Sequence, residues 1–281
     1  MKTAAIALAA GAVLTVGGCR AARPASRPAP AQAARSGPST EEKVVITIVF
    51  DNNAGAAGLE TAWGFGCVVR GPEKTILFDT GGDGRILLAN MKKLGIAPAD
   101  IDALVISHAH GDHTGGLAAL LAARGGVPVY IPAGAGASLA EQIRSHGAEP
   151  IEADASADVC DGAKTTGTLG KGAIEEHGLC VKTAAGWVLI TGCAHPGAAV
   201  MAAKATEVTA GALELVVGGF HMGSHSKAQI DAVIDEFEKL AVRRAAPCHC
   251  SGDNTRKQFQ QRYGQRCSLV GVGAVFDFAG E

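Results

Sequence analysis

Residues 105–116 read VISHAHGDHTGG and carry more information than any other part of the chain. They place three imidazoles and one carboxylate within six positions, directly after an apolar run that predicts a buried strand. Imidazole nitrogens and carboxylate oxygens are the ligands that zinc and related divalent metals prefer. His108 and His110 can point the same way from an extended tip, whereas Asp112 and His113 follow a glycine turn. One short loop could therefore direct two pairs of ligands at two adjacent metal ions, and this pattern disfavours a polar loop of solvated histidines.

Composition and charge narrow the class of protein. The 281 residues are 47% hydrophobic and 19% charged, which fits one globular domain or at most two small ones. This composition excludes a disordered chain, a collagen-like repeat and a polytopic membrane protein. The net charge of −2 is uneven, because residues 20–40 carry four arginines and no acid, whereas residues 41–281 carry 20 basic against 27 acidic side chains. Since phosphate contacts need clustered basic residues, we expect a small-molecule substrate and no nucleic-acid partner.

The first 42 residues have the pattern of an export and anchoring signal. An apolar run over residues 4–16 is too short to span a bilayer as a finished helix. It leads into VGGC, ending at Cys19, which resembles the lipobox of bacterial lipoproteins, where a signal peptidase cuts before the cysteine and the thiol receives diacylglycerol. We predict a signal peptide over residues 1–18, then lipidated Cys19 and an Ala/Pro/Arg-rich tether over residues 19–42, leaving residues 43–281 as the domain. The protein would be exported and lipid-anchored to the cell envelope, on its periplasmic or extracellular face. The alternatives are an ordinary secretory signal with an incidental cysteine and a short anchor helix.

Strand and helix patterns alternate from residue 43 onward. We expect strands at residues 44–50, 66–69, 75–78, 103–107, 127–131, 187–191, 213–217, 245–248 and 269–276. We expect helices at residues 85–94, 117–124, 138–145, 198–204, 228–240 and 255–262, with Ser226 capping the fifth. Residues 151–175 give no clear prediction. Strands that first form a meander and then mix with helices predict a layered α/β sandwich with sheets inside and helices outside.

A second motif, LFDTG at residues 77–81, precedes the histidine-rich stretch. Together the two motifs resemble the metallo-β-lactamase superfamily, and the resemblance spans Val44 to Phe276. It implies an α/β fold of the four-layer αββα sandwich type. It also implies that Asp79 supports the histidines by hydrogen bonds rather than binding metal, as metal sites that must hold their geometry require. Capping of the turn at residues 81–82 is a further role open to this carboxylate.

Further motifs follow at ordered positions, namely ITGCAHPG (190–197), VGGFHM (217–222) and PCHCSG (247–252), with WGFG (63–66) upstream. They are similar to the superfamily branch of 7,8-dihydropterin-6-methyl-4-(β-D-ribofuranosyl)-aminobenzene-5'-phosphate synthases. The resemblance implies a metal shell of His108, His110, Asp112, His113, His195 and His249. This shell would hold one or two divalent ions, Zn²⁺ first, with Mn²⁺ or Fe²⁺ as alternatives.

Several residues keep two interpretations. Cys193 stands where the superfamily usually has a bridging aspartate, so it is either a metal ligand or, as we favour, a buried packing cysteine. His177 competes with His195 for one coordination position. His221 either contacts substrate or has a structural role. Seven cysteines follow Cys19, so at least one of them must be free or metal-bound in an exported protein.

These patterns predict a metal-dependent hydrolase that uses a metal-bound hydroxide, oriented by Asp112, on a small ester, lactone or phosphoester. The fold does not encode the substrate. The synthase activity of the branch needs a phosphoribosyl donor and aminobenzoate, which an exported lipoprotein would rarely meet. The alternative function is a membrane-tethered, non-catalytic protein that binds or senses metal on the same fold.

Overall fold

The computed structural model describes residues 43–71, 73–170 and 174–278. The predicted signal peptide, Cys19 and the tether up to residue 42 lie outside the described residues. Among the residues that are described, no helix is long and apolar enough to cross a membrane.

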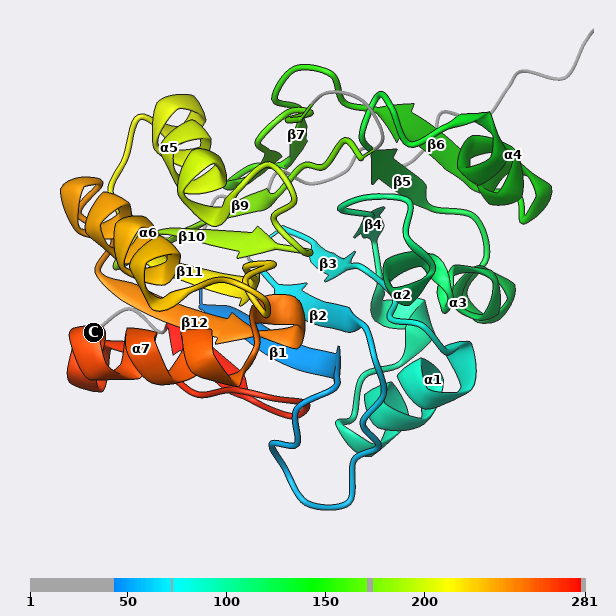
Figure 1. The fold of residues 1–281 in the computed structure, drawn as a ribbon. Helices are drawn as coiled ribbons and strands as arrows, with labels where there is room; N and C mark the ends of the chain where they lie inside the picture. Colours follow the sequence, from blue (N-terminus) through cyan, green and yellow to red (C-terminus); the bar gives the residue numbers. More distant parts are fainter. Residues whose placement is uncertain (1–42, 72, 171–173, 279–281) are drawn as a thin grey trace, which may run out of the picture. The chain divides into compact units, whose positions relative to one another are not determined.

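The first sheet has seven strands in the order β13-β1-β2-β3-β4-β5-β6 (Figure 1). Its strands are β1 (Val44–Asp51), β2 (Phe65–Arg70), β3 (Thr75–Phe78), β4 (Ala103–Val105), β5 (Pro128–Ile131), β6 (Glu149–Glu152) and β13 (Val275–Phe278). Strands β1 to β3 form an antiparallel meander, and β3 to β6 run parallel to one another. Because β3 and β4 are parallel, both strands end at the same edge of the sheet, and the loops that follow them begin there.

The second sheet has six strands in the order β12-β11-β10-β9-β8-β7. Its strands are β7 (Asp158–Cys160), β8 (Ala163–Thr165), β9 (Leu179–Thr183), β10 (Gly186–Thr191), β11 (Leu213–Gly219) and β12 (Arg244–Cys248). Here β10, β11 and β12 are parallel, while β7 to β10 pair antiparallel. Loops that follow the three parallel strands therefore leave the sheet from a common edge.

Helices cover the outer faces of both sheets (Figure 1). The helices are α1 (Gly84–Lys93), α2 (Gly111–Thr114), α3 (Leu117–Arg124), α4 (Ala137–Ser145), α5 (Ala198–Thr209), α6 (Lys227–Lys239) and α7 (Asp253–Tyr263). Short 3₁₀ turns lie at Pro98–Asp100, His249–Ser251 and Gly264–Arg266. Ser226 caps α6 as predicted, because its hydroxyl accepts from the Gln229 N–H and Gln229 reaches back to the Ser226 N–H.

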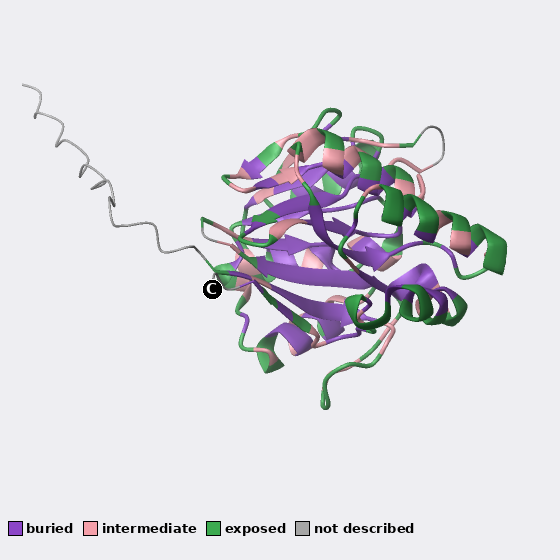
Figure 2. Ribbon diagram, turned by 90° about the vertical axis from the view of Figure 1, so that its left-hand side faces the viewer, coloured by how far each residue is buried: buried purple, intermediate pink, exposed green. Residues whose placement is uncertain are grey.

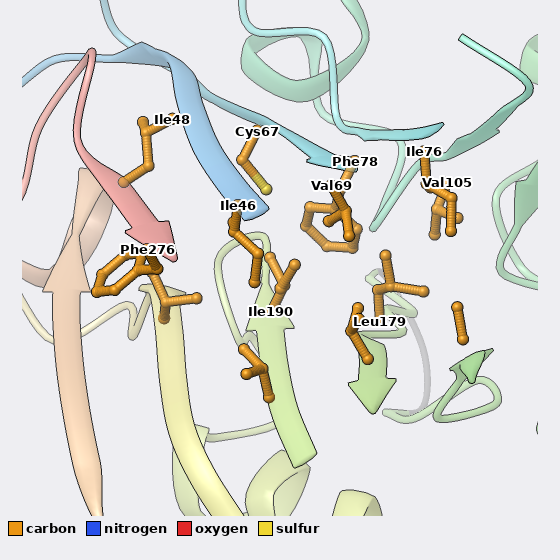
Figure 3. Close-up of a cluster of buried hydrophobic side chains, with 14 of the residues drawn as sticks. Ile46, Ile48, Cys67, Val69, Ile76, Phe78, Val105, Leu179, Ile190 and Phe276 are labelled. Atoms are coloured by element: carbon orange, nitrogen blue, oxygen red, sulfur yellow. The ribbon is translucent and has the colours of Figure 1, made fainter. Parts of the chain in front are cut away.

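Apolar side chains form three layers between the four layers of secondary structure. Residues from both sheets, such as Ile46, Phe78 and Ile190, fill the space between the sheets (Figure 3). One further cluster joins the first sheet to α1, α3 and α4, and another joins the second sheet to α5, α6 and α7. The strands are mostly buried and the helices are exposed on their outer faces (Figure 2). This arrangement confirms the predicted αββα sandwich.

The sequence patterns failed where strands are short or polar. Strands β6, β7 and β8 fall in or next to residues 151–175, and the prediction also missed β9. Their three to five residues carry too few apolar positions to show an alternation, and pairing with neighbours defines them instead.

The last strand begins at Val275, not at residue 269. The preceding segment runs against the loop after β1, where the Val272 N–H donates to Asn53 O at 3.0 Å. Gly271 permits this approach, because a Cβ there would overlap the Asn53 carbonyl.

Candidate metal centre

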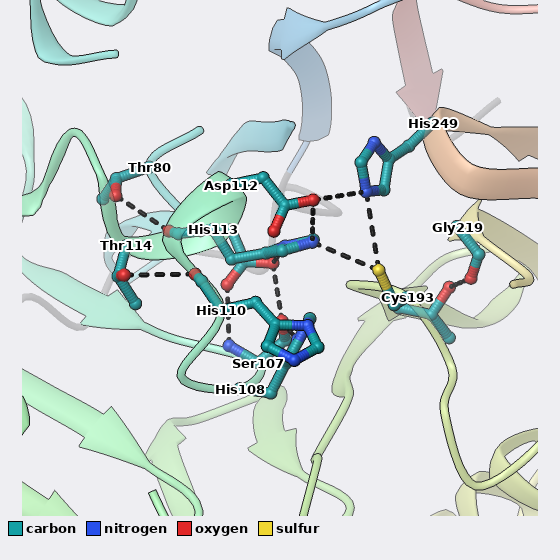
Figure 4. Close-up of polar contacts among 12 residues, drawn as sticks. Thr80, Ser107, His108, His110, Asp112, His113, Thr114, Cys193, Gly219 and His249 are labelled. Atoms are coloured by element: carbon teal, nitrogen blue, oxygen red, sulfur yellow. Dashed lines mark hydrogen bonds and ion pairs between the residues drawn. The ribbon is translucent and has the colours of Figure 1, made fainter. Parts of the chain in front are cut away.

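Loops from both sheets meet at one edge of the sandwich (Figure 4). The histidine loop, residues 107–114, follows β4 and contains the one-turn helix α2. Two partner loops come from the second sheet, residues 192–197 after β10 and residues 249–252 after β12. Because parallel strands end at a common edge, ligands far apart in sequence come together here.

The first group of ligands contains His108, His110 and His195. His108 Nε2 lies 3.0 Å from His110 Nδ1, and the two rings are inclined at 74° to each other. The His195 ring centre lies 4.8 Å from that of His108 and 5.0 Å from that of His110. His195 Nε2 is buried and has no hydrogen-bond partner among the described residues. A cation held by His108 and His195 would also satisfy this nitrogen; His110 belongs to none of the groups of described residues whose ligand atoms could hold one ion, so its place in the shell stays a prediction.

The second group contains Asp112, His113, Cys193 and His249. Asp112 Oδ2 lies 3.3 Å from His249 Nε2 and 3.6 Å from His113 Nε2. Cys193 Sγ lies 3.3 Å from His113 Nε2 and 3.5 Å from His249 Nε2. Four donors placed tetrahedrally about one zinc ion, at bond lengths of ~2.0–2.3 Å, lie roughly 3.3–3.6 Å from one another. The donor set therefore has the size and chemistry of a zinc site.

Cys193 does not act as the packing cysteine that we favoured from the sequence. Its sulfur faces the nitrogens of His113 and His249 instead of the apolar core, although the residue is buried (Figure 4). The same sulfur also belongs to a group with His108 and His195. The structure thus places the thiol among the candidate ligands.

Buried hydrogen bonds orient the histidine loop. Asp79 accepts at 2.7 Å from the Ser107 N–H and hydroxyl, and its Oδ2 lies 2.7 Å from His113 Nδ1. The Ser107 hydroxyl also lies 2.9 Å from His108 Nδ1. The other nitrogen of each imidazole is thereby directed at the centre. Asp79 thus has the hydrogen-bonding position that the resemblance implied; the turn after it is closed by the Gly81 N–H, which donates to the Phe65 carbonyl.

Two supporting residues escaped the sequence analysis. The Glu176 carboxylate is fully buried and accepts three backbone N–H groups, from Cys193 at 2.9 Å, Ala194 at 2.7 Å and His195 at 2.8 Å. Asn52 Oδ1 lies 3.0 Å from Nδ1 of His249. The sequence around Glu176 (Glu-His-Gly) and around Asn52 (Asn-Asn) contains no recognisable motif. The two roles could not be predicted because each depends on a contact with a loop that is distant in the sequence.

Burial and neighbouring charges lower the pKa of two candidate ligands, His108 and His195. Burial, with the nearby His221 and His110 rings, lowers the pKa of His195 to about 4, and burial with other imidazoles lowers the pKa of His108 well below its usual value. Burial also opposes protonation of His113, but the Asp79 carboxylate outweighs it and raises the pKa of that ring. Neutral imidazoles are the form that binds metal.

His177 is not part of the centre. The ring is fully buried and belongs to none of the groups of described residues that could hold a metal ion. His177 Nδ1 and Nε2 have no hydrogen-bond partner among the described residues, and burial lowers the pKa of the ring to about 3. Of the two rivals for one position, the structure brings only His195 to the other ligands.

His221 lies at the rim of the centre. It is exposed, its ring centre is 4.2 Å from that of His195, and its backbone is left-handed with a φ of 51°. It also forms a small group with the sulfurs of Cys193 and Cys250. The seven described cysteines are all free thiols, and no disulfide joins any two of them.

A cavity of about 200 Å³ opens beside the centre. Its walls include Trp63, His249 and Arg256. The Trp63 side chain is 59% exposed, and its ring centre lies 4.9 Å from that of His249. A cavity of this size next to the ligands suits part of a small molecule.

Comparisons with known proteins agree with this architecture. The 7,8-dihydropterin-6-methyl-4-(beta-D-ribofuranosyl)-aminobenzene-5'-phosphate synthase of Methanocaldococcus jannaschii is 26% identical over 252 residues, covering 74% of this chain and 86% of that protein. The crystal structure of Tm1679, a metal-dependent hydrolase of the beta-lactamase superfamily, superposes with a TM-score of 0.71 at 24% identity, over 84% of this chain and 100% of that one. A diphosphatase from the PhnP family gives a TM-score of 0.56 at 19% identity, over 84% and 97%. The family model of the metallo-beta-lactamase superfamily matches residues 67–227. This chain therefore belongs to the metallo-beta-lactamase superfamily and is a metallo-hydrolase of that fold.

Proposed function

We propose that this chain hydrolyses a small ester, lactone or phosphoester with one or two divalent ions, most simply Zn²⁺. The observation that carries the proposal is the convergence of two ligand groups at one edge of the sandwich. His108, His110 and His195 would hold one ion. Asp112, His113 and His249 would hold the other.

Asp112 is the residue that we place in catalysis. Burial raises the pKa of its carboxyl, but the hydrogen bond from His249 and the charges of His113 and His249 outweigh this and hold the pKa well below its usual range. The group is therefore a carboxylate at neutral pH. It is partly exposed and contacts both histidines through Oδ2, which leaves Oδ1 to accept a proton from an attacking water. When bound, the metal ions supply a Lewis acid and lower the pKa of coordinated water toward ~7.

The surroundings of the centre favour a small substrate. The cavity beside His249 holds about 200 Å³ and is lined by the exposed Trp63 indole and by Arg256, whose terminal nitrogens donate to the Asn53 side chain and the Val270 carbonyl. The name of the M. jannaschii relative contains a 5'-phosphate, which supports phosphoesters as one class to test. Residues 41–281 carry 20 basic against 27 acidic side chains, and this acidic balance disfavours a nucleic-acid substrate.

The test compares the metal-loaded and the chelated protein. Full-length chain is loaded in turn with Zn²⁺, Mn²⁺ and Fe²⁺, and hydrolysis is measured on p-nitrophenyl esters, bis-p-nitrophenyl phosphate and N-acyl lactones. We expect turnover of at least one class that disappears on chelation and returns on reloading. Stoichiometric metal binding without turnover of any substrate would instead favour the alternative, a tethered protein that binds or senses metal.

We also propose that the chain is exported and held at the cell envelope by a lipid on Cys19. The support is the sequence alone, namely the apolar run over residues 4–16 and the VGGC that ends at Cys19. Cys19→Ser should block lipid labelling and move the protein out of the membrane fraction, with Cys267→Ser as the control. A Cys19→Ser protein that is processed normally and stays on membranes in high salt would exclude this anchor.

A further inference from the structure

We infer that the Cys193 thiolate is a ligand common to both metal positions, where the superfamily usually carries a bridging carboxylate. The inference rests on the proposed metal centre and specifies how its two halves are joined. Cys193 is the residue shared by the group Asp112, His113, His249 and the group His108, His195. Within each group, every ligand atom lies within 4.8 Å of the others.

The distances place the sulfur between the two halves. Cys193 Sγ lies 3.3 Å from His113 Nε2 and 3.5 Å from His249 Nε2, which are separations of ligands on one ion. The ring of His113 in turn lies 4.2 Å, centre to centre, from the ring of His108 in the other half. The ligand atoms of Cys193, His108 and His195 also lie within 4.8 Å of one another, so a single sulfur can face both ions.

The backbone around Cys193 fixes where its sulfur lies. Gly192 packs against Ser107 and Asp79, because a Cβ at residue 192 would overlap the Ser107 hydroxyl and lie 3.0 Å from Asp79 Oδ2. On the other side, the Gly219 N–H donates to the Gly192 carbonyl at 3.0 Å. Gly192 thus contacts the histidine loop on one side and Gly219 on the other, and these contacts fix the position of the adjacent Cys193.

Glu176 completes this support. Its three hydrogen bonds run along the backbone from Cys193 to His195, with Ala194 between them in the left-handed conformation at a φ of 60°. A strained conformation of a residue other than glycine persists only where the surroundings hold it. Here the left-handed Ala194 lies between two candidate ligands, Cys193 and His195, and allows both side chains to reach the same centre.

Charge also favours a thiolate at this place. Among the groups of described residues that could hold a metal ion, Asp112 supplies the only carboxylate. The carboxylate oxygens of Asp79 and Glu176 already accept hydrogen bonds from N–H and hydroxyl donors. Two divalent ions would therefore meet one negative ligand unless Cys193 adds a second. A thiol that coordinates zinc loses its proton, here to solvent, and a shared thiolate gives charge to both ions.

Cys250 is the natural rival as a source of sulfur. Its Sγ lies in a group with Cys193 and His221 but in neither of the two main groups. Its thiol donates to the Cys193 carbonyl at 3.7 Å, so it contacts the backbone of the partner loop. Cys250→Ser is therefore the matched control for Cys193.

Cobalt reports sulfur ligation directly. The full-length protein is titrated with zero to two equivalents of Co²⁺ while the thiolate-to-cobalt charge-transfer absorption and the electron paramagnetic resonance signal are recorded. We expect the absorption to rise with both equivalents and the two cobalt spins to couple. Cys193→Ser should lose the absorption, and Cys250→Ser should keep it. Cys193→Asp, which offers a carboxylate at the same place, should bind two ions without the absorption and guards against a fold defect.

Three results would overturn the inference. An absorption that saturates at one equivalent would make Cys193 a ligand of a single ion. Loss of the absorption in Cys250→Ser, with retention in Cys193→Ser, would move the sulfur ligand to Cys250. Absence of any absorption in the cobalt-loaded wild type would leave both thiols outside the metal shell. None of these results depends on turnover, so the proposed hydrolase could fail its substrate panel while the shared thiolate stands.

Discussion

The histidine loop and the partner loops supply the same centre but are built differently. The histidine loop carries four candidate ligands in six consecutive positions, and its main support, Asp79, lies one strand away in the same sheet. The partner loops bring ligands that are 56 positions apart in the chain, Cys193 and His249. Their supports, Glu176 and Asn52, come from other segments again. The ligands of the histidine loop thus come from one contiguous motif, whereas the ligands of the partner loops are brought together only by the tertiary structure.

This difference predicts how each half fails. Damage to the histidine loop should lower both metal affinity and turnover, because the loop carries four candidate ligands and Asp112 is also the residue that we place in catalysis. Damage to the supports of the partner loops should act first on metal affinity, since those supports orient ligands without touching substrate.

The largest expected effect is that of Asp112→Ala. Removing the carboxylate removes a ligand and the group that accepts a proton from water, so kcat/KM should fall at least about 100-fold on whichever substrate class the wild type hydrolyses. His113 and His249 remain, and the partly exposed site should keep the fold intact. Turnover, metal content and thermal unfolding are measured together, with the exposed Asp154→Ala as control. Activity near that of the wild type at full metal occupancy would remove Asp112 from the mechanism.

Glu176→Gln tests the partner loops. The carboxylate accepts three backbone N–H groups, whereas an amide presents an NH₂ to one of them and carries no charge. Supporting residues of this kind typically contribute 10–100-fold to metal affinity, so we expect about that loss for one of two ions. The measurement is competition with a chelator, and Glu175→Gln, the neighbouring carboxylate, is the control. Unchanged affinity for both ions would show that the loop holds its shape without this charge.

The same contrast explains what could be predicted from sequence. The sandwich and the histidine loop were predictable, because apolar periodicity and a compact ligand motif are local properties. Glu176 was not, because its role depends on a loop 17 to 19 positions away folding back onto it. The sequence favours a packing role for Cys193, because a buried free cysteine usually behaves as a small apolar residue, and only the approach of His113 and His249 shows otherwise. Strands β7 and β8 were missed for a similar reason, since pairing defines them.

The smallest effect concerns His177, the imidazole next to Glu176 that the centre leaves out. Burial lowers its pKa in the folded protein to about 3, against about 6.5 when unfolded. A base whose folded pKa is depressed contributes stability above its unfolded pKa and loses that contribution as the pH falls, because the unfolded chain takes up the proton first. Between pH 7 and pH 5 this loss amounts to about 2 kcal/mol.

The free energy of unfolding of His177→Leu should therefore fall less over this interval than that of the wild type, by up to this amount. Urea unfolding of the metal-free proteins at both pH values gives the difference, and the partly exposed His146→Gln provides the control. Equal pH dependence in wild type and His177→Leu would mean that the ring takes up its proton over the same pH range in the folded and unfolded protein, so that burial does not lower its pKa.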